Sequence, residues 1–310
     1  MLVSIIVCTH NLDNYQNLIQ TIESLLKQTY REIEIVIVVD GNHDLFQKVL
    51  PIYIDRSNIK ILENEFSLGA FGAGNVGVKV ATGDIIAFID DDAVADTKWL
   101  ENLVKIYKER NAISVGGKVL PIWLSKQPDS FPEELYWLVG VTHSDFRSGL
   151  ISEVRNSYGV NMSFKKDVFD KIGYFNAKLG FAKGGASYLQ GAEPEFALRM
   201  KQRFGKGVLY NPEAIVYHKI PASKTRFGKL IRRAFYQGYS KALMKRFGSL
   251  PGTLTTEKSY LRDLLFNYIP RHIDGVFSSH CWREIKRLNL VGSVIISVGI
   301  GFLYGYAKGR

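Results

Sequence analysis

Short apolar runs alternate with helical stripes along the first third of the chain, and this rhythm limits the fold more than any other feature. The apolar runs, each predicted to form a strand, are Val3–Cys8, Ile33–Val39, Ile59–Leu62, Ile85–Ile89 and Ala112–Val115. Apolar residues recur at helical spacing in segments 12–26, 76–81 and 99–107. Strands that alternate with helices in this way predict a mainly parallel sheet that is covered by helices on both faces.

Polar residues follow three of these strands directly. They are Thr9 and Asn11 after the first strand, Asp40 after the second, and Asp90, Asp91 and Asp92 after the fourth. The carboxyl ends of parallel strands meet at one edge of a sheet, and α/β proteins bind their ligands there. We therefore expect these side chains to form one site.

The three consecutive carboxylates point to a cation. They cannot all be buried without partners, because each charge would lose its hydration, and they repel one another unless a cation lies among them. Oxygen ligands at alternate positions, here Asp90 and Asp92, suit Mg2+ or Mn2+, and these ions in turn suit a diphosphate. The alternative is an acidic loop that caps the next helix through Asp96.

Charge is unevenly distributed along the chain. Residues 1–218 hold 23 Lys and Arg against 26 Asp and Glu, or −3, whereas residues 219–310 hold 17 against 4, or +13, which together give +10. A basic block of this size predicts an anionic surface partner: an anionic lipid, a polyprenyl phosphate or a nucleic acid. The basic residues expected to hold the chain to an anionic leaflet are Arg226, Lys229, Arg232, Arg233, Lys241, Lys245 and Arg246. The alternative is an ordinary solvated helix face.

The C-terminal segment Leu288–Tyr306 contains no charged residue. As a helix it would be about 28 Å long, close to the thickness of a bilayer core. Gly301 and Gly305 have the small-xxx-small spacing of packed membrane helices. We expect membrane contact and leave spanning and interfacial placement open; the alternative is a buried helix pair of a soluble protein.

Cys8 and Cys281 are too few for a disulfide framework, and the apolar N-terminus is too short for a signal peptide, so the cytoplasmic side is expected.

Four segments together resemble family 2 glycosyltransferases, which have the GT-A fold. They are Val3–Asn11, Ile35–Gly41, Gly69–Gly77 and Gly83–Asp92. The resemblance covers about residues 1–245 and implies an α/β fold with a Rossmann-like, mainly parallel sheet and a basic, partly apolar helical extension. The domains expected are a glycosyltransferase domain, 1–218, with a nucleotide-sugar half (about 1–118) and an acceptor half (119–218), and a membrane-associating region, 219–310.

The resemblance also implies roles for individual residues. Those expected to bind the nucleotide-sugar are Thr9, Asn11, Asp40, Gly69, Asn75, Asp90 and Asp91, while Asp92 and His218 would bind a divalent cation, Mn2+ or Mg2+. Asp40 would accept a hydrogen bond from the uracil imide, although taken alone it suits a turn-capping role better. A strand-end histidine such as His218 is also commonly just solvated. Gly74 departs from the family, which commonly has Arg there.

Glu193 is the candidate general base. In the family a Glu-Asp pair precedes a helix that contains an Arg, and alignment on Arg199 places Glu193 at the Asp position and Ala192 at the Glu position. Glu193 would take the proton of the acceptor hydroxyl as this hydroxyl attacks the anomeric carbon, which inverts the configuration. An N-cap role is the alternative. Glu195 and Arg199 are each expected to pack or pair structurally.

Further segments resemble a set of archaeal-type glucosyl-dolichyl-phosphate glucuronosyltransferases. They are Pro132–Gly140, Arg155–Phe164, Val216–Pro221 and Tyr236–Ala242. This implies a UDP-sugar donor such as UDP-glucuronate, a polyprenyl- or dolichyl-phosphate-linked acceptor, and contacts of Trp137 and Asn161 with that acceptor. The reaction is expected at the cytoplasmic face of the membrane, without nucleic acid. The alternatives are a polysaccharide acceptor, a non-catalytic nucleotide-binding module at the membrane surface, and a nucleotidyl transferase with Lys79.

Overall fold

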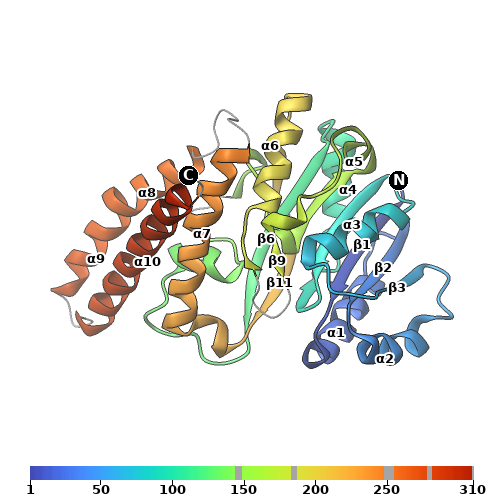
Figure 1. The fold of residues 1–310 in the computed structure, drawn as a ribbon, viewed down its shortest axis with the longest axis horizontal. Helices are drawn as coiled ribbons and strands as arrows, with labels where there is room; N and C mark the ends of the chain where they lie inside the picture. The colour runs from blue at the N-terminus through green and yellow to red at the C-terminus, as the bar shows by residue number, and fades with distance from the viewer. Residues whose placement is uncertain (144–148, 183–186, 248–254, 278–280, 309–310) are drawn as a thin grey trace. The chain divides into compact units, whose positions relative to one another are not determined.

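The computed structural model describes residues 1–143, 149–182, 187–247, 255–277 and 281–308 (Figure 1). It divides into two compact units. The sheet unit comprises Met1–Pro121, Arg147–Tyr188 and Ala192–Lys219, and the helical unit comprises Ile122–Phe146, Leu189–Gly191 and Ile220–Arg310. The predicted domain boundary between residues 218 and 219 stays a prediction.

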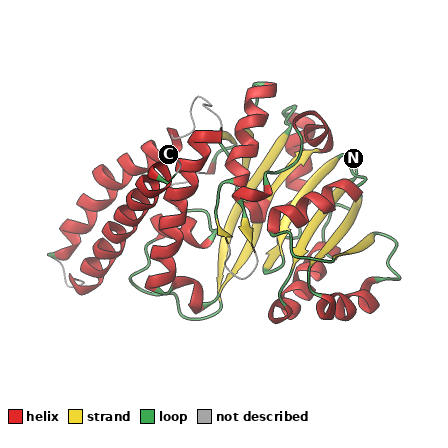
Figure 2. Cartoon of the chain, viewed as in Figure 1, coloured by secondary structure: helices red, strands yellow, loops and turns green. Residues whose placement is uncertain are grey.

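One mixed sheet forms the centre of the sheet unit (Figure 2). Its order in the described residues is β3-β2-β1-β4-β8-β6-β11-β5, with β7 beside β11. The strands are β1 Val3–Thr9, β2 Ile33–Asp40, β3 Ile59–Asn64, β4 Ile85–Asp90, β5 Ala93–Ala95, β6 Ser114–Trp123, β7 Ser152–Val154, β8 Met162–Lys165 and β11 Val208–Ile220. The first four are parallel, as predicted, whereas β8 runs antiparallel to β4 and β6. A separate hairpin joins β9 Phe181–Ala182 to β10 Ser187–Tyr188.

Helices pack on both faces of this sheet, which confirms the predicted α/β class. They are α1 Tyr15–Leu26, α2 His43–Tyr53, α3 Ala70–Val80, α4 Trp99–Glu109, α5 Lys166–Ile172 and α6 Ala192–Phe204. Alternate strand residues, Ile5 and Ile35 among them, form one buried core with α1, α2 and α4. Phe88, on the other face of β4, lies in an aromatic cluster with Phe169 of α5 and Phe196 of α6.

The structure differs from the predicted elements at two helices. The helix expected over 76–81 begins earlier, because α3 already starts at Ala70, within the glycine-rich segment from Gly69. Gly69 has φ +77°, which a glycine adopts easily, and Gly77 allows α3 to approach β1, since a Cβ there would lie 2.8 Å from Ile6 Cγ2. Helix α2 was not predicted, although Leu45, Val49 and Tyr53 recur at helical spacing and are buried; Pro51, a residue that usually ends a helix, lies inside it.

The helical unit contains α7 Phe227–Phe247, α8 Thr255–Asp263, α9 Ile269–Val276 and α10 Cys281–Ala307, with a π-helical turn, Leu264–Tyr268, between α8 and α9. A short 3-10 helix, Glu133–Val139, completes its core. In the described residues, α10 is the helix long and apolar enough to cross a membrane, by length and composition only. The side chain of Arg246 lies outside the described part.

Glycines set the close packing of α10 on α7. A Cβ at Gly301 would overlap the carbonyl oxygen of Phe235, and a Cβ at Gly238 would overlap that of Val298. The hydroxyl of Ser297 donates a hydrogen bond to the Ile231 carbonyl at 2.8 Å. The small-xxx-small spacing thus packs α10 against another helix of the same chain.

Substitution of Gly301 by alanine is expected to destabilise the helical unit by about 2 kcal/mol, because the backbones must move apart. Gly299→Ala is the matched control, since no atom lies within 4 Å of a Cβ there. The control is expected to keep or raise stability, because alanine favours a helix. Thermal unfolding of the full chain, followed by circular dichroism, measures both; equal melting temperatures would contradict the packing.

Candidate functional site

The register of the parallel strands brings the predicted polar residues to one edge of the sheet. Cys8 pairs with Asp90, Thr9 pairs with Val39, and Asp40 pairs with Asn64. The ends of β1, β2, β3 and β4 are therefore level with one another. This edge is the place that the fold class predicts for a ligand.

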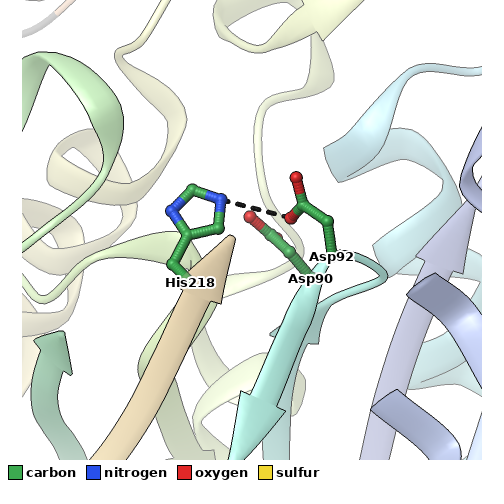
Figure 3. Close-up of side chains that lie close together, drawn as sticks. All are labelled: Asp90, Asp92 and His218. Carbon is green, nitrogen blue, oxygen red and sulfur yellow. Dashed lines mark ion pairs between the residues drawn. The ribbon is translucent and has the colours of Figure 1, made fainter. Parts of the chain in front are cut away.

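Asp90, Asp92 and His218 come together at this edge (Figure 3). One ligand atom from each lies within 4.8 Å of the others, and His218 Nε2 lies 3.1 Å from Asp92 Oδ1. Asp90 is exposed, whereas the His218 side chain is only 7% exposed. The cluster therefore has one ligand that is buried, His218, and one that is open to solvent, Asp90.

An antiparallel strand pair explains how a residue 126 positions further along the chain (218 − 92) reaches the acidic turn. Directly after Asp92 the chain forms β5, which pairs with β11 so that His218 lies opposite Ala93. The Lys219 amide also donates a hydrogen bond to the Asp92 carbonyl at 3.0 Å. The backbone thus holds the histidine beside the second ligand.

The residues of the cluster fit a divalent cation. Ligand atoms about 2.1 Å from one ion lie at most about 4.2 Å apart, which is close to the spacing here. Two carboxylates and an imidazole suit Mn2+, and the carboxylates alone suit Mg2+. The geometry therefore supports a metal site, and the identity of the ion stays a prediction.

Asp91 points away from this cluster and into the protein. It is 8% exposed and accepts a hydrogen bond from the Thr9 hydroxyl at 2.6 Å, with the Asn14 amide at 3.3 Å. Thr9 itself is 2% exposed. Both residues thus fix the turn on which Asp90 and Asp92 lie, and their direct contact with the donor stays a prediction.

Lys219 is a buried cation behind the acidic turn that sequence reasoning missed. Its side chain donates hydrogen bonds to Asn17 and Gln20, and the residue is 5% exposed. Burial lowers the pKa of Lys219, and the negative charges of Asp92 and Asp91 oppose this. The ammonium group offsets part of the repulsion among the carboxylates. Its position after His218 on an expected strand was the available signal.

Asp40 is 3% exposed and organises the loop after β3. Its two carboxylate oxygens accept hydrogen bonds from the Asn64 amide, the Ser67 hydroxyl and the backbone amides of Leu68 and Gly69, at 2.8–3.0 Å. These contacts match the turn-capping alternative. The predicted contact with a uracil base stays a prediction, because the contacts do not address it.

Asn75 and Asn11 also have local partners. The Asn75 amide donates to the Phe175 carbonyl at 2.9 Å and accepts from its amide at 3.0 Å, which ties α3 to that loop. Asn11 is exposed and accepts a hydrogen bond from the Asp13 amide at 3.0 Å. Donor binding by either residue stays a prediction.

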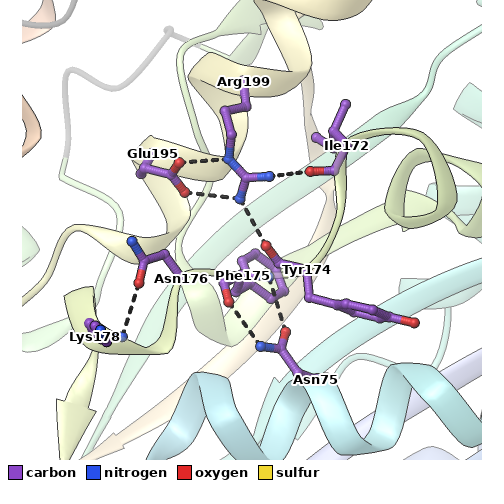
Figure 4. Close-up of polar contacts among 8 residues, drawn as sticks. All are labelled: Asn75, Ile172, Tyr174, Phe175, Asn176, Lys178, Glu195 and Arg199. Carbon is purple, nitrogen blue, oxygen red and sulfur yellow. Dashed lines mark hydrogen bonds and ion pairs between the residues drawn. The ribbon is translucent and has the colours of Figure 1, made fainter. Parts of the chain in front are cut away.

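Glu193 lies in the first turn of α6, one residue after the helix begins, and is partly exposed. Its Oε1 would lie 3.0 Å from a Cβ at Gly159, so the glycine leaves room for the carboxylate. Glu195 instead pairs with Arg199 at 2.6 Å, and Arg199 also donates hydrogen bonds to the carbonyls of Ile172 and Tyr174 (Figure 4). The structural role expected for Glu195 and for Arg199 is therefore confirmed, and the ion pair joins the two residues.

The two residues predicted to bind the acceptor have structural partners. Asn161 is fully buried, accepts a hydrogen bond from Trp99 Nε1 at 2.9 Å and donates to the carbonyls of Lys118 and Ala214. In the helical unit, Trp137 Nε1 donates to the Tyr260 hydroxyl at 2.8 Å. Acceptor contact stays a prediction for both, and the burial of Asn161 does not favour it.

Comparisons with known sequences agree with this geometry. A family model described as Glycosyl transferase family 2 matches residues 4–173. A glucosyl-dolichyl phosphate glucuronosyltransferase of Haloferax volcanii is 36% identical over 306 residues, which cover 98% of this chain and 96% of the relative. The glycosyltransferase GlyG of Streptococcus pneumoniae serotype 4 is 33% identical over 117 residues, or 37% of this chain and 38% of the relative.

Solved structures show the same fold. The mannosyltransferase PcManGT from Pyrobaculum calidifontis, in complex with GDP-Man and Mn2+, aligns with a TM-score of 0.62 at 16% identity, over 97% of this chain and 87% of its own. TarS of S. aureus, in complex with UDP-GlcNAc, aligns with a TM-score of 0.57 at 16% identity, over 96% and 82%. The predicted GT-A fold is thereby confirmed.

Proposed function

The chain belongs to glycosyl transferase family 2, and from this premise we propose that it moves a sugar from a UDP-sugar to a polyprenyl- or dolichyl-phosphate-linked acceptor, with inversion, at the cytoplasmic face of a membrane. That the chain is a glycosyltransferase follows from the family. The donor, the acceptor and the membrane face are the proposed part.

The cluster of Asp90, Asp92 and His218 is the observation that carries this proposal. These residues would hold the cation, which would neutralise the charge that develops on the leaving nucleoside diphosphate. Asp91, Thr9 and Lys219 would support the cluster, because they fix the turn and offset its charge. Asp40 shapes the neighbouring loop, from Asn64 to Gly69, on which a nucleotide would rest.

Glu193 is proposed to accept the proton of the acceptor hydroxyl. It lies at the start of a 13-residue helix, where the dipole favours the ionised carboxylate that a base needs. Gly159 beside it has no side chain to cover the carboxylate. One displacement, with the hydroxyl entering opposite to the leaving diphosphate, inverts the anomeric configuration.

The relative from Haloferax volcanii supports the finer choice of substrates, because its name specifies glucuronosyl transfer to a glucosyl-dolichyl phosphate. Its alignment covers nearly the whole of both chains, so it includes the basic C-terminal region. That region, with 17 Lys and Arg against 4 Asp and Glu in residues 219–310, suits an anionic leaflet that presents a lipid phosphate.

A thermal-shift screen tests the donor. UDP-, GDP- and dTDP-sugars are added to the full chain with and without Mn2+, and a UDP-sugar is expected to raise the melting temperature only when the ion is present. Transfer is then assayed with a dolichyl-phosphate-linked glucoside and with a soluble glucoside. Transfer to the soluble acceptor alone would overturn the lipid part, and no shift with any sugar nucleotide would overturn the whole proposal.

A further inference from the structure

Helix α10 exposes an unusual row of large apolar side chains. We call this row the apolar face; its members are Trp282, Ile285, Ile296, Ile300 and Leu303. They recur at helical spacing, so they lie on one side of the helix. Trp282 is 77% and Leu303 is 68% exposed. Asn289, Gly292 and Ser293 lie on the same side between Ile285 and Ile296, so the apolar face has two apolar ends. Exposed large apolar side chains that cluster in this way mark a contact site with a partner or a membrane.

The opposite side of α10 is already occupied. Gly301 and Gly305 lie against Phe235, Tyr239 and Ala242 of α7, and Ser297 bonds to the α7 backbone. A helix that crosses a bilayer in this packing would take α7 into the hydrocarbon with it. Because α7 contains Lys229, Arg232, Arg233, Lys241 and Lys245, and each charge costs about 3 kcal/mol at the membrane centre, this placement is unfavourable.

The N-terminal end of α10, where the apolar face begins, is held in place by contacts with other parts of the helical unit. Glu284, 6% exposed, accepts a hydrogen bond from His272 of α9, and the His272 ring lies 4.1 Å from that of Tyr268. Arg287 contacts Glu284 and also donates to the Asp129 carbonyl at 3.1 Å. These contacts join α9, α10 and the 122–146 segment of the helical unit, so the exposed Trp282 lies on an ordered element.

The positive charge of the helical unit indicates an anionic partner for the apolar face. Residues 220–310 hold 16 Lys and Arg against 4 Asp and Glu, or +12. Exposed basic residues accompany the aromatic end of the apolar face: Arg283 and Lys286 are on α10, and Arg271 is on α9, the helix that ends before the exposed Phe277. Apolar and aromatic side chains beside lysine and arginine are typical of helices that lie in the interface of an anionic bilayer.

We propose that α10 lies in the plane of an anionic bilayer, with the apolar face in the acyl boundary and α7 on its other side, and that it does not span the membrane. The inference deepens the proposed function, since it specifies how a lipid-linked acceptor would be met. The occupant of the apolar face is lipid; a second copy of the chain is the competing occupant.

Vesicle binding tests the surface without any sugar substrate. The full chain is expected to float with vesicles of phosphatidylglycerol and phosphatidylcholine, and much less with phosphatidylcholine alone. Ile300→Glu with Leu303→Glu is expected to weaken binding by at least about tenfold. Leu150→Glu, which alters an equally exposed leucine (69%) of the sheet unit, is the matched control and should leave binding unchanged. Equal loss in both variants would overturn the proposal.

Depth measurements separate in-plane from spanning placement. Lipids brominated near the head group or near the chain end quench tryptophan fluorescence according to its depth. Because Trp99, Trp123 and Trp137 also fluoresce, the signal of Trp282 is the difference between the unchanged chain and Trp282→Phe, and that of position 296 is the difference between Trp282→Phe with Ile296→Trp and Trp282→Phe alone. An in-plane helix places both at the same shallow depth. A spanning helix separates them by about 21 Å along its axis, so position 296 would be deep. A deep signal, or dimers without vesicle binding, refutes the inference. Because no donor or acceptor is present, vesicle binding with the predicted depths can succeed even if the proposed transfer fails.

Discussion

Asp92→Ala is expected to abolish sugar transfer, with a loss in kcat/KM of at least about 10^3. Asp92 is the carboxylate in direct contact with His218, at 3.1 Å, so its removal leaves the cluster with one carboxylate and the imidazole. The same change should weaken nucleotide binding in the presence of Mn2+ and leave metal-free binding little altered. Transfer assays and calorimetry with and without Mn2+ measure the two effects.

Asp96→Ala provides the control for this experiment. Asp96 belongs to the same acidic segment, but its Oδ1 accepts a hydrogen bond from the Lys98 amide at 2.9 Å in the turn before α4. Lys98 is the N-cap residue of α4 and has no side-chain cap, so Asp96 stabilises the turn before the helix and does not cap the helix itself. Loss of this hydrogen bond is expected to cost about 1 kcal/mol of stability and to leave transfer intact. Equal activity of Asp92→Ala and the wild type would remove the metal site from the mechanism.

The parallel part of the fold and the edge that holds the site follow from the sequence alone. Uninterrupted apolar runs such as Ile85–Ile89 can only be buried on both faces, and this requires helices on both sides. The position of Asp90 and Asp92 at a strand end then follows from chain order. These inferences succeed because they depend on local pattern and on one topological rule.

The contact between His218 and Asp92 could not be predicted from pattern. It depends on the antiparallel pairing of β11 with β5, a strand of only three residues whose sequence, Ala93–Ala95, has no period of its own. The family resemblance suggested His218 as a ligand, but the register of this pair is what places it there. A short edge strand is defined by its partner, and the partner lies far away in the sequence.

Burial also separated residues that were expected to share one role. Asp90 and Asp91 were both expected to bind the nucleotide-sugar, yet Asp91 accepts a hydrogen bond from Thr9, whereas Asp90 lies with Asp92 and His218. Asn161 and Asn75 are polar residues of recognisable segments, and both satisfy backbone groups: Asn161 those of strands β6 and β11, and Asn75 those of Phe175 in a loop. A sequence motif therefore does not distinguish a residue that binds the substrate or the metal from a residue that holds the binding residues in place.

Glu193→Gln is expected to lower kcat by 10^2- to 10^4-fold while nucleotide binding is retained. The amide keeps the size of the side chain and loses the ability to accept a proton, so the effect isolates the proposed base. Steady-state kinetics with saturating donor, together with calorimetry of donor binding, separate the two quantities. A purely structural N-cap would instead show a lower melting temperature with a nearly normal kcat.

Glu195→Gln is the matched control, because it changes an acid in the same first turn of α6 that pairs with Arg199. It is expected to reduce stability by about 1 kcal/mol, since Arg199 loses a charged partner but keeps its hydrogen bonds to two carbonyls. Transfer should continue. A fully active Glu193→Gln beside an inactive Glu195→Gln would reverse the assignment and make the Arg199 pair the catalytic element of the helix.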